Sequence, residues 1–178
     1  DISRLENGRI TPRRRSFPLS EIFDALGTEF SVLARNEGVD FHIRGSKLTI
    51  DSDPKMLRRV LQNFLTNAFR VAGGHVRLGV RRECRRLRLE VWDRGPGIPV
   101  NRQKVICEEF KRLDSHQTRA EKGLGLGLAI VERAAGALGH GIGLRSDLGR
   151  GSCFSVTLPL SPAKLSPCPP APDRQRSR

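Results

Sequence analysis

Long apolar segments, tyrosine and paired cysteines are the features that this 178-residue sequence lacks. It contains no apolar run of roughly 18 residues, so no transmembrane helix is expected. Residues 1–12 hold no apolar core of the kind found in a signal peptide. The four cysteines form no C-x-x-C pair, which argues against a zinc site or a thioredoxin-like motif. We therefore expect free thiols in a reducing, cytoplasmic compartment, and no membrane contact by this part of the protein.

Acidic residues are also scarce, because 32 lysines and arginines face 19 aspartates and glutamates and leave a net charge of +13. Six of the arginines lie within residues 77–88. Aromatic residues, which stack on bases in many nucleic-acid binders, make up 5% of the chain and are absent from that stretch. We therefore interpret residues 77–88 as a solvated strand face and expect no nucleic-acid partner.

Helical and strand-like segments alternate along the chain. Apolar spacing predicts helices over residues 19–37, 53–71, 101–107 and 124–138. Strands are expected near 39–44 and 47–51, joined by Gly45 and Ser46, then in a hairpin over 75–92, and finally at 142–146 and 152–158. This succession predicts an α+β protein, a two-layer α/β sandwich whose mixed, mostly antiparallel sheet is covered by helices on one face.

The helix expected at 53–71 carries polar residues beside its apolar stripe. The stripe consists of Leu57, Val60, Leu61, Phe64, Ala68 and Val71. Asn63 and Asn67 are four residues apart and so share one face with Arg70 close by. They could be ordinary half-exposed residues. Alternatively, they form a row facing a ligand, with an amide oxygen for Mg²⁺ and Arg70 for phosphate oxygens.

The segment DRGPGIP, residues 93–99, follows the expected hairpin. Asp93 has the same strand parity as Leu89 and Val91, so its carboxylate is expected on the buried face, where it needs a partner. Gly95 and Gly97 lack side chains, so a flat ligand could approach the backbone there. An adenine whose exocyclic amine donates to Asp93 would satisfy both features. An ordinary Asp-Gly turn is the alternative.

The segment GLGLGL, residues 123–128, leads into the helix expected at 124–138. Backbone N–H groups at a helix N-terminus bind phosphate. The segment is not a Walker loop, because no GK[ST] follows, and its glycines have the wrong spacing for a Rossmann fingerprint. Alone it is weak evidence, since 18 glycines occur in the chain.

The order of these motifs is more specific than any one of them. Over about residues 1–160 the chain resembles the catalytic ATP-binding domain of sensor histidine kinases, in the Bergerat-type ATPase superfamily. NFLTNAFRVA is similar to the Asn box of that family, DRGPGIP and GLGLGLAIV to its two glycine boxes, and EEFKRLDS to its Phe box. The resemblance divides the chain into the end of a dimerisation and phosphoacceptor helix (1–12), a catalytic domain (13–160) and a disordered Pro-rich linker or tail (161–178).

The resemblance also implies a role for each residue that matches a motif. Asn67, helped by Asn63, would hold Mg²⁺, and Arg70 and Arg112 would approach the phosphates of ATP. The residues expected to contact adenine or to shape its pocket are Asp93, Gly95, Gly97, Ile98 and Ser152. Phe110 would anchor a lid over about 108–122. The residues expected to hinge the lid and line the phosphates are Gly123, Leu124, Gly125, Leu126 and Gly127.

The function implied is transfer of the γ-phosphate of ATP to a histidine on the dimerisation helix of a homodimeric protein, for onward transfer to a response regulator or receiver domain. Val71, Ala72, Cys107 and Leu124 depart from the usual residues of the family. An ATP-hydrolysing relative is one alternative, but such enzymes place a glutamate at position 63 to activate water, where this chain has Asn63. The other alternative is a non-catalytic nucleotide sensor or basic docking module.

Overall fold

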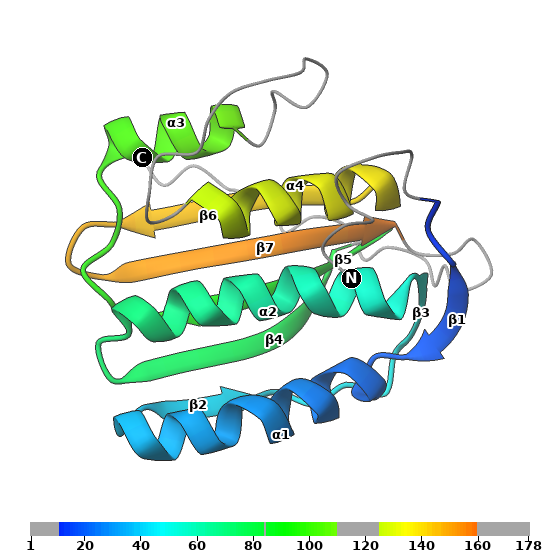
Figure 1. Cartoon of the computed structure of the whole chain (residues 1–178), viewed down its shortest axis with the longest axis horizontal. Helices are drawn as coiled ribbons and strands as arrows, with labels where there is room; N and C mark the ends of the chain where they lie inside the picture. Colours follow the sequence, from blue (N-terminus) through cyan, green and yellow to red (C-terminus); the bar gives the residue numbers. More distant parts are fainter. Residues whose placement is uncertain (1–10, 84, 110–124, 160–178) are drawn as a thin grey trace, which may run out of the picture.

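The computed structural model describes residues 11–83, 85–109 and 125–159 (Figure 1). In chain order the elements are β1 (Arg15–Pro18), α1 (Ser20–Glu37), β2 (Asp40–Ile43), β3 (Thr49–Ser52), α2 (Pro54–Val71), β4 (His75–Glu83), β5 (Arg86–Asp93), α3 (Val100–Glu109), α4 (Gly125–Leu138), β6 (Gly141–Asp147) and β7 (Gly151–Pro159). No helix in this part of the chain is long and apolar enough to cross a membrane.

A five-stranded sheet in the order β2-β4-β5-β7-β6 forms one layer of the molecule. β2 pairs with β4 in parallel, and the remaining pairs are antiparallel. In Figure 1 the helices α1, α2 and α4 lie in front of this sheet and form the second layer. The predicted two-layer α/β sandwich with a mixed, mostly antiparallel sheet is therefore confirmed.

The sequence predicted two strands joined by Gly45 and Ser46. Both strands are present, but they do not pair with each other. β2 joins the main sheet through β4, whereas β3 pairs with β1 in a separate two-stranded sheet. The two strands belong to different sheets because α2 returns the chain so that β4 runs beside β2 in parallel. β1 was not expected at all, since its four residues bury only one side chain, that of Phe17.

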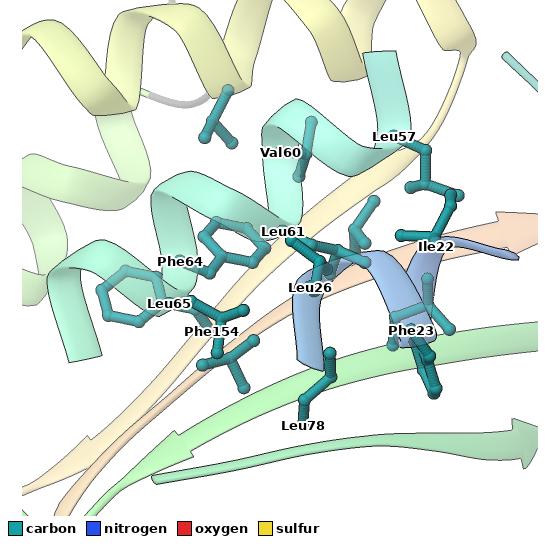
Figure 2. Packing of buried hydrophobic residues seen from close by; sticks show 14 of the residues in the cluster. Ile22, Phe23, Leu26, Leu57, Val60, Leu61, Phe64, Leu65, Leu78 and Phe154 are labelled. Atoms are coloured by element: carbon teal, nitrogen blue, oxygen red, sulfur yellow. The ribbon is translucent and has the colours of Figure 1, made fainter. Parts of the chain in front are cut away.

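The core lies between the helices and the inner face of the sheet, as Figure 2 shows. α2 contributes most, through the buried residues Leu57, Val60, Leu61, Phe64, Leu65, Ala68 and Phe69. The ring of Phe64 lies 5.5 Å from that of Phe154 on β7. Val71 was expected in this stripe but is 43% exposed, because it is the last residue of the helix.

Residues 13 and 14 tie the start of α2 to the end of α4. The Asp53 carboxylate caps α2 by accepting from the backbone N–H of Lys55 at 2.9 Å and of Met56 at 3.1 Å, and it also accepts from the N–H of Arg13 at 2.8 Å. The Arg14 guanidinium donates to the Leu138 carbonyl at the end of α4. Close by, the buried His140 Nε2 lies 2.9 Å from the Ser52 hydroxyl.

Candidate functional site

Asp93 ends β5 on the inner face of the sheet and is 4% exposed. Its Oδ1 accepts from the backbone N–H of Gly95 at 2.8 Å and of Ser152 at 3.3 Å. Burial raises the pKa of the Asp93 carboxyl above its ordinary value, and these two backbone bonds offset part of the rise. No side-chain or backbone donor in the described ranges bonds to the other oxygen, Oδ2. The carboxylate is therefore oriented through one oxygen, while the other is without a donor in this part of the chain.

Gly95 and Gly97 have a different physical role from the one that the sequence suggested. A Cβ on Gly95 would clash with the carbonyl oxygen of Val71 at the end of α2. A Cβ on Gly97, whose φ is +75°, would clash with the carbonyl oxygen of Asp147. The space beside both glycines is thus filled by protein backbone rather than left open for a ligand. They allow the loop after Asp93 to pack tightly between α2 and the β6–β7 turn.

A polar network that sequence reasoning missed holds this loop against β6. The Ser146 hydroxyl accepts from the Ile98 N–H at 2.8 Å and donates to the Gly151 carbonyl at 3.0 Å. It also lies 2.9 Å from the Ser152 hydroxyl. The Gln103 amide on α3 donates to the carbonyls of Ile98 at 2.6 Å and of Ser146 at 2.9 Å. The one available signal was the parity of Ser146, which follows Ile142 and Leu144 on the inner face.

The two asparagines of α2 lie on the side of that helix that faces α4. The Asn63 Nδ2 donates to the Arg59 carbonyl one turn earlier at 2.8 Å. A Cβ on Gly127, in the first turn of α4, would lie 2.8 Å from Asn63 Oδ1, so the absence of a side chain there lets the two helices approach. The Asn67 Nδ2 is shielded from solvent and has no hydrogen-bond partner in the described part of the chain.

The two asparagine side chains could hold a magnesium ion only together with other ligands, such as a phosphate group. Among the residues that the structure describes, no group of three or more His, Cys, Asp and Glu side chains could hold a metal ion alone. Mg²⁺ commonly takes only one or two protein oxygens and completes its shell with substrate phosphates and water. The Asn67 amide offers an oxygen for the ion and an unpartnered N–H for a phosphate oxygen, so it fits both partners.

The structure thus brings most of the expected residues into two groups. Asp93, Gly95, Ile98 and Ser152 lie together at the end of β5, and Asn63 lies beside Gly127. The end of α2 connects the groups, because its Val71 carbonyl packs against Gly95. Arg70 is exposed on the same helix. The remaining expected positions lie outside the described residues, or are described there by backbone alone: Phe110, Arg112, Gly123, Leu124, Gly125 and Leu126.

The sequence pattern of a known family covers both groups. The family described as "Histidine kinase-, DNA gyrase B-, and HSP90-like ATPase" matches residues 52–162. The chain belongs to this family of ATPases. Its Asn-bearing helix, the Asp93 loop and the glycine-rich start of α4 all fall within the matched range.

Several relatives with similar sequences are named histidine kinases. Hybrid signal transduction histidine kinase D of Dictyostelium discoideum is 32% identical over 173 residues, which are 91% of this chain and 11% of the relative. Circadian input-output histidine kinase CikA of Synechococcus elongatus is 33% identical over 178 residues, 97% of this chain and 24% of the relative. The chain therefore spans only about a tenth to a quarter of these curated relatives.

Solved structures show the same fold. Full-length ShkA, crystallised in complex with AMPPNP, is 30% identical with a TM-score of 0.73, and the match covers 88% of this chain and 33% of ShkA. The catalytic domain of the histidine kinase ThkA matches 84% of this chain and 99% of its own length with a TM-score of 0.69. ThkA is 24% identical, so this second likeness concerns the fold alone.

Proposed function

We propose that this chain is the catalytic domain of a sensor histidine kinase, which binds ATP with Mg²⁺ and transfers the γ-phosphate to a histidine. Membership of the ATPase family, the names of the relatives and the order of the motifs support this function. In the whole protein, the acceptor histidine lies on a dimerisation helix of the homodimer, and an aspartate of a response regulator or receiver domain takes the phosphate from it.

The observation that carries the proposal is the state of the Asp93 carboxylate. Two backbone N–H groups hold Oδ1 at 2.8 and 3.3 Å, and Oδ2 has no donor in the described ranges. The exocyclic amine of adenine is the donor that this oxygen would accept. Because Asp93 is buried, the bond forms away from competing water and selects a base that carries an amine at this position.

The phosphates of the same nucleotide would lie toward Asn67, Arg70 and the start of α4. The Asn67 amide N–H donates to a phosphate oxygen, and Arg70 adds a positive charge. The backbone N–H groups in the first turn of α4 are free of intrahelical partners and favour an anion. Mg²⁺ bound to the Asn67 oxygen, with help from Asn63, would neutralise the charge that phosphoryl transfer develops.

Asn63 favours transfer to a histidine over hydrolysis of ATP. An amide cannot take a proton from water, and its Nδ2 already donates to Arg59. The histidines that the structure describes are poor acceptors. His140 is buried against Ser52, and His42 and His75 are held by Asp40 on the outer face of the sheet, away from the helices. We therefore place the acceptor on another segment of the whole protein.

The rest of the proposal concerns the parts of the chain around this domain. We assign residues 1–12 to the end of the dimerisation helix, 13–160 to the catalytic domain and 161–178 to a disordered linker or tail. Residues 1–10 and 160–178 lie outside the described part of the chain. We further propose a cytoplasmic location for this domain, with a receiver domain or response regulator as partner, as the hybrid kinases among the relatives suggest.

Calorimetry with a non-hydrolysable ATP analogue tests the site. Asp93→Asn should weaken the analogue by roughly 10-fold or more, both in Mg²⁺ and in EDTA, because one desolvated hydrogen bond to a charged group is lost. Asn67→Ala should weaken binding mainly in Mg²⁺. Equal losses for Asn67→Ala in both buffers would contradict its role in holding the metal. Absence of Mg²⁺-dependent binding by the unchanged chain would favour the non-catalytic module instead.

Radiolabelled ATP tests the reaction. The chain alone should remain unlabelled, whereas a separate dimerisation helix that carries a histidine should acquire acid-labile phosphate when the chain is added. Release of inorganic phosphate without labelling of the helix would favour the hydrolase. Acid-labile label on the chain alone, lost in His116→Ala, would overturn the proposal that the acceptor lies elsewhere.

A further inference from the structure

The outer face of the five-stranded sheet, opposite the helices, carries arginines from the neighbouring strands β4 and β5 and from β6, which β7 separates from β5. Strand register puts Arg77 and Arg81 of β4, Arg86 and Arg88 of β5, and Arg145 of β6 on this side, because the alternate residues are the buried core positions. We call these five residues the arginine face. In Figure 1 the helices α1, α2 and α4 lie on the other side of the sheet, and Arg77, Arg81 and Arg86 are exposed.

The two carboxylates of β4 and β5 on this face are already paired. Glu83 lies 3.1 Å from Arg88. The buried Glu90 lies 3.0 Å from Arg145, 3.8 Å from Arg88 and 3.1 Å from the Trp92 indole N–H. Arg77, Arg81 and Arg86 are exposed and have no carboxylate partner among the described residues. Three guanidinium groups therefore remain for a partner.

One pair of arginines on this face repels across the strands. Arg81 and Arg88 stand directly opposite each other in the β4–β5 ladder. Like charges at such positions destabilise a sheet, and while Arg88 is paired with Glu83, Arg81 has no carboxylate partner among the described residues. A carboxylate supplied from outside would relieve this repulsion and could accept both N–H groups of one guanidinium fork.

We propose that the arginine face is a docking surface for an acidic protein surface, distinct from the proposed nucleotide site on the helical side of the sheet. The positive charge of the face requires an anionic partner. The aromatic and apolar side chains on the face, described next, favour a protein over a nucleic acid or a membrane. The one exposed aromatic ring here, Trp92, already has the Arg145 guanidinium 5.2 Å from its ring centroid, and a single ring offers little stacking for successive bases. No other large apolar side chain is exposed on these strands to enter a membrane.

Binding of a fluorescein-labelled polyglutamate peptide of about 20 residues tests this surface on the full chain. Arg77→Gln, Arg81→Gln and Arg86→Gln are combined in one variant. The matched control combines Arg35→Gln, Lys47→Gln and Arg102→Gln, which remove the same charge from exposed positions on α1, the β2–β3 connection and α3. Fluorescence anisotropy at about 0.1 M salt gives the dissociation constants.

The face variant should bind polyglutamate about 10-fold more weakly, and the control variant less than 2-fold more weakly. Equal losses in the two variants would show attraction by net charge alone and overturn the proposal. Tighter binding of single-stranded oligo-dT or of phosphatidylserine vesicles than of polyglutamate, if lost in the face variant, would overturn it in favour of nucleic acid or membrane. Should the combined variant unfold, Arg81→Gln alone should still weaken polyglutamate about 2-fold, and an unchanged affinity would refute the docking surface.

Discussion

Acidification should destabilise this domain through one buried histidine. His140 is 6% exposed and follows the end of α4, where its Nε2 lies 2.9 Å from the Ser52 hydroxyl. Burial, and then repulsion from the Arg14 guanidinium, lower the pKa of His140 from its ordinary 6.5 to about 4. The folded protein therefore keeps a neutral imidazole under conditions in which the unfolded chain has already bound a proton.

The sign and size of the effect follow from proton linkage. Because the pKa is lower in the folded state, the stabilisation is complete above pH 6.5 and is lost as the pH falls toward 4. Each pKa unit corresponds to about 1.4 kcal/mol, so the full loss is about 3 kcal/mol, of which about 2 kcal/mol has been lost by pH 5. That is a large fraction of the stability of an ordinary domain.

Urea unfolding between pH 8 and pH 5, followed by the fluorescence of Trp92, measures the effect. In the His140→Gln variant the glutamine keeps a polar group near Ser52 but does not titrate. Between pH 8 and pH 5 the free energy of unfolding of this variant should therefore decrease by about 2 kcal/mol less than that of the unchanged chain. Arg14→Gln removes the repulsion and should also flatten the profile, although it loses the bond to Leu138. Parallel pH profiles for the unchanged chain and His140→Gln would refute the reasoning.

Two further substitutions test the local structure. Gly97→Ala should lower the free energy of unfolding, measured by urea titration, by at least about 1–2 kcal/mol. Both the positive φ of Gly97 and the nearby Asp147 carbonyl oppose a Cβ at this position. Gly136→Ala, with nothing within 4 Å of its Cβ, should instead be neutral or stabilising. Asp53→Ala should lower the melting temperature, because it removes the N-cap of α2, which contributes about 1–2 kcal/mol to the free energy of unfolding, and the contact with Arg13. Asp51→Ala is the control: Asp51 is exposed on β3, so its replacement should change the melting temperature little. Equal effects of Asp53→Ala and Asp51→Ala would contradict the capping role.

Local signals in the sequence were sufficient for the elements that carry the site. The apolar spacing of α2 predicted the helix and most of its buried side. Val71, the last residue of the helix, is exposed instead, and Leu65 and Phe69 are buried although the predicted stripe did not include them. Asp93 was predicted to be buried from the parity of Leu89 and Val91, and it is. Periodicity works in these cases because burial along a single helix or strand depends on residues close together in the chain.

Pairing between distant segments could not be predicted in the same way. β2 and β3 are separated by five residues, yet each pairs with a strand elsewhere in the chain. Their four-residue patterns fit a hairpin as well as they fit two separate ladders. The choice is made by the whole packing of α1 and α2 on the sheet, which no local pattern contains. For the same reason, the contact between Gln103 on α3 and the Ser146 carbonyl on β6 left no motif to find.

Glycine motifs are ambiguous in the sequence for a related reason. A glycine allows either a ligand or another part of the same chain to approach the backbone closely. The sequence motif is the same in both cases. In the loop after Asp93 the structure shows the second case, since Val71 and Asp147 carbonyls occupy the space beside Gly95 and Gly97. These contacts connect the end of α2 and the β6–β7 turn to the loop that orients the Asp93 carboxylate. A side chain at either glycine would therefore act on a nucleotide indirectly, by moving that carboxylate, rather than by filling the pocket.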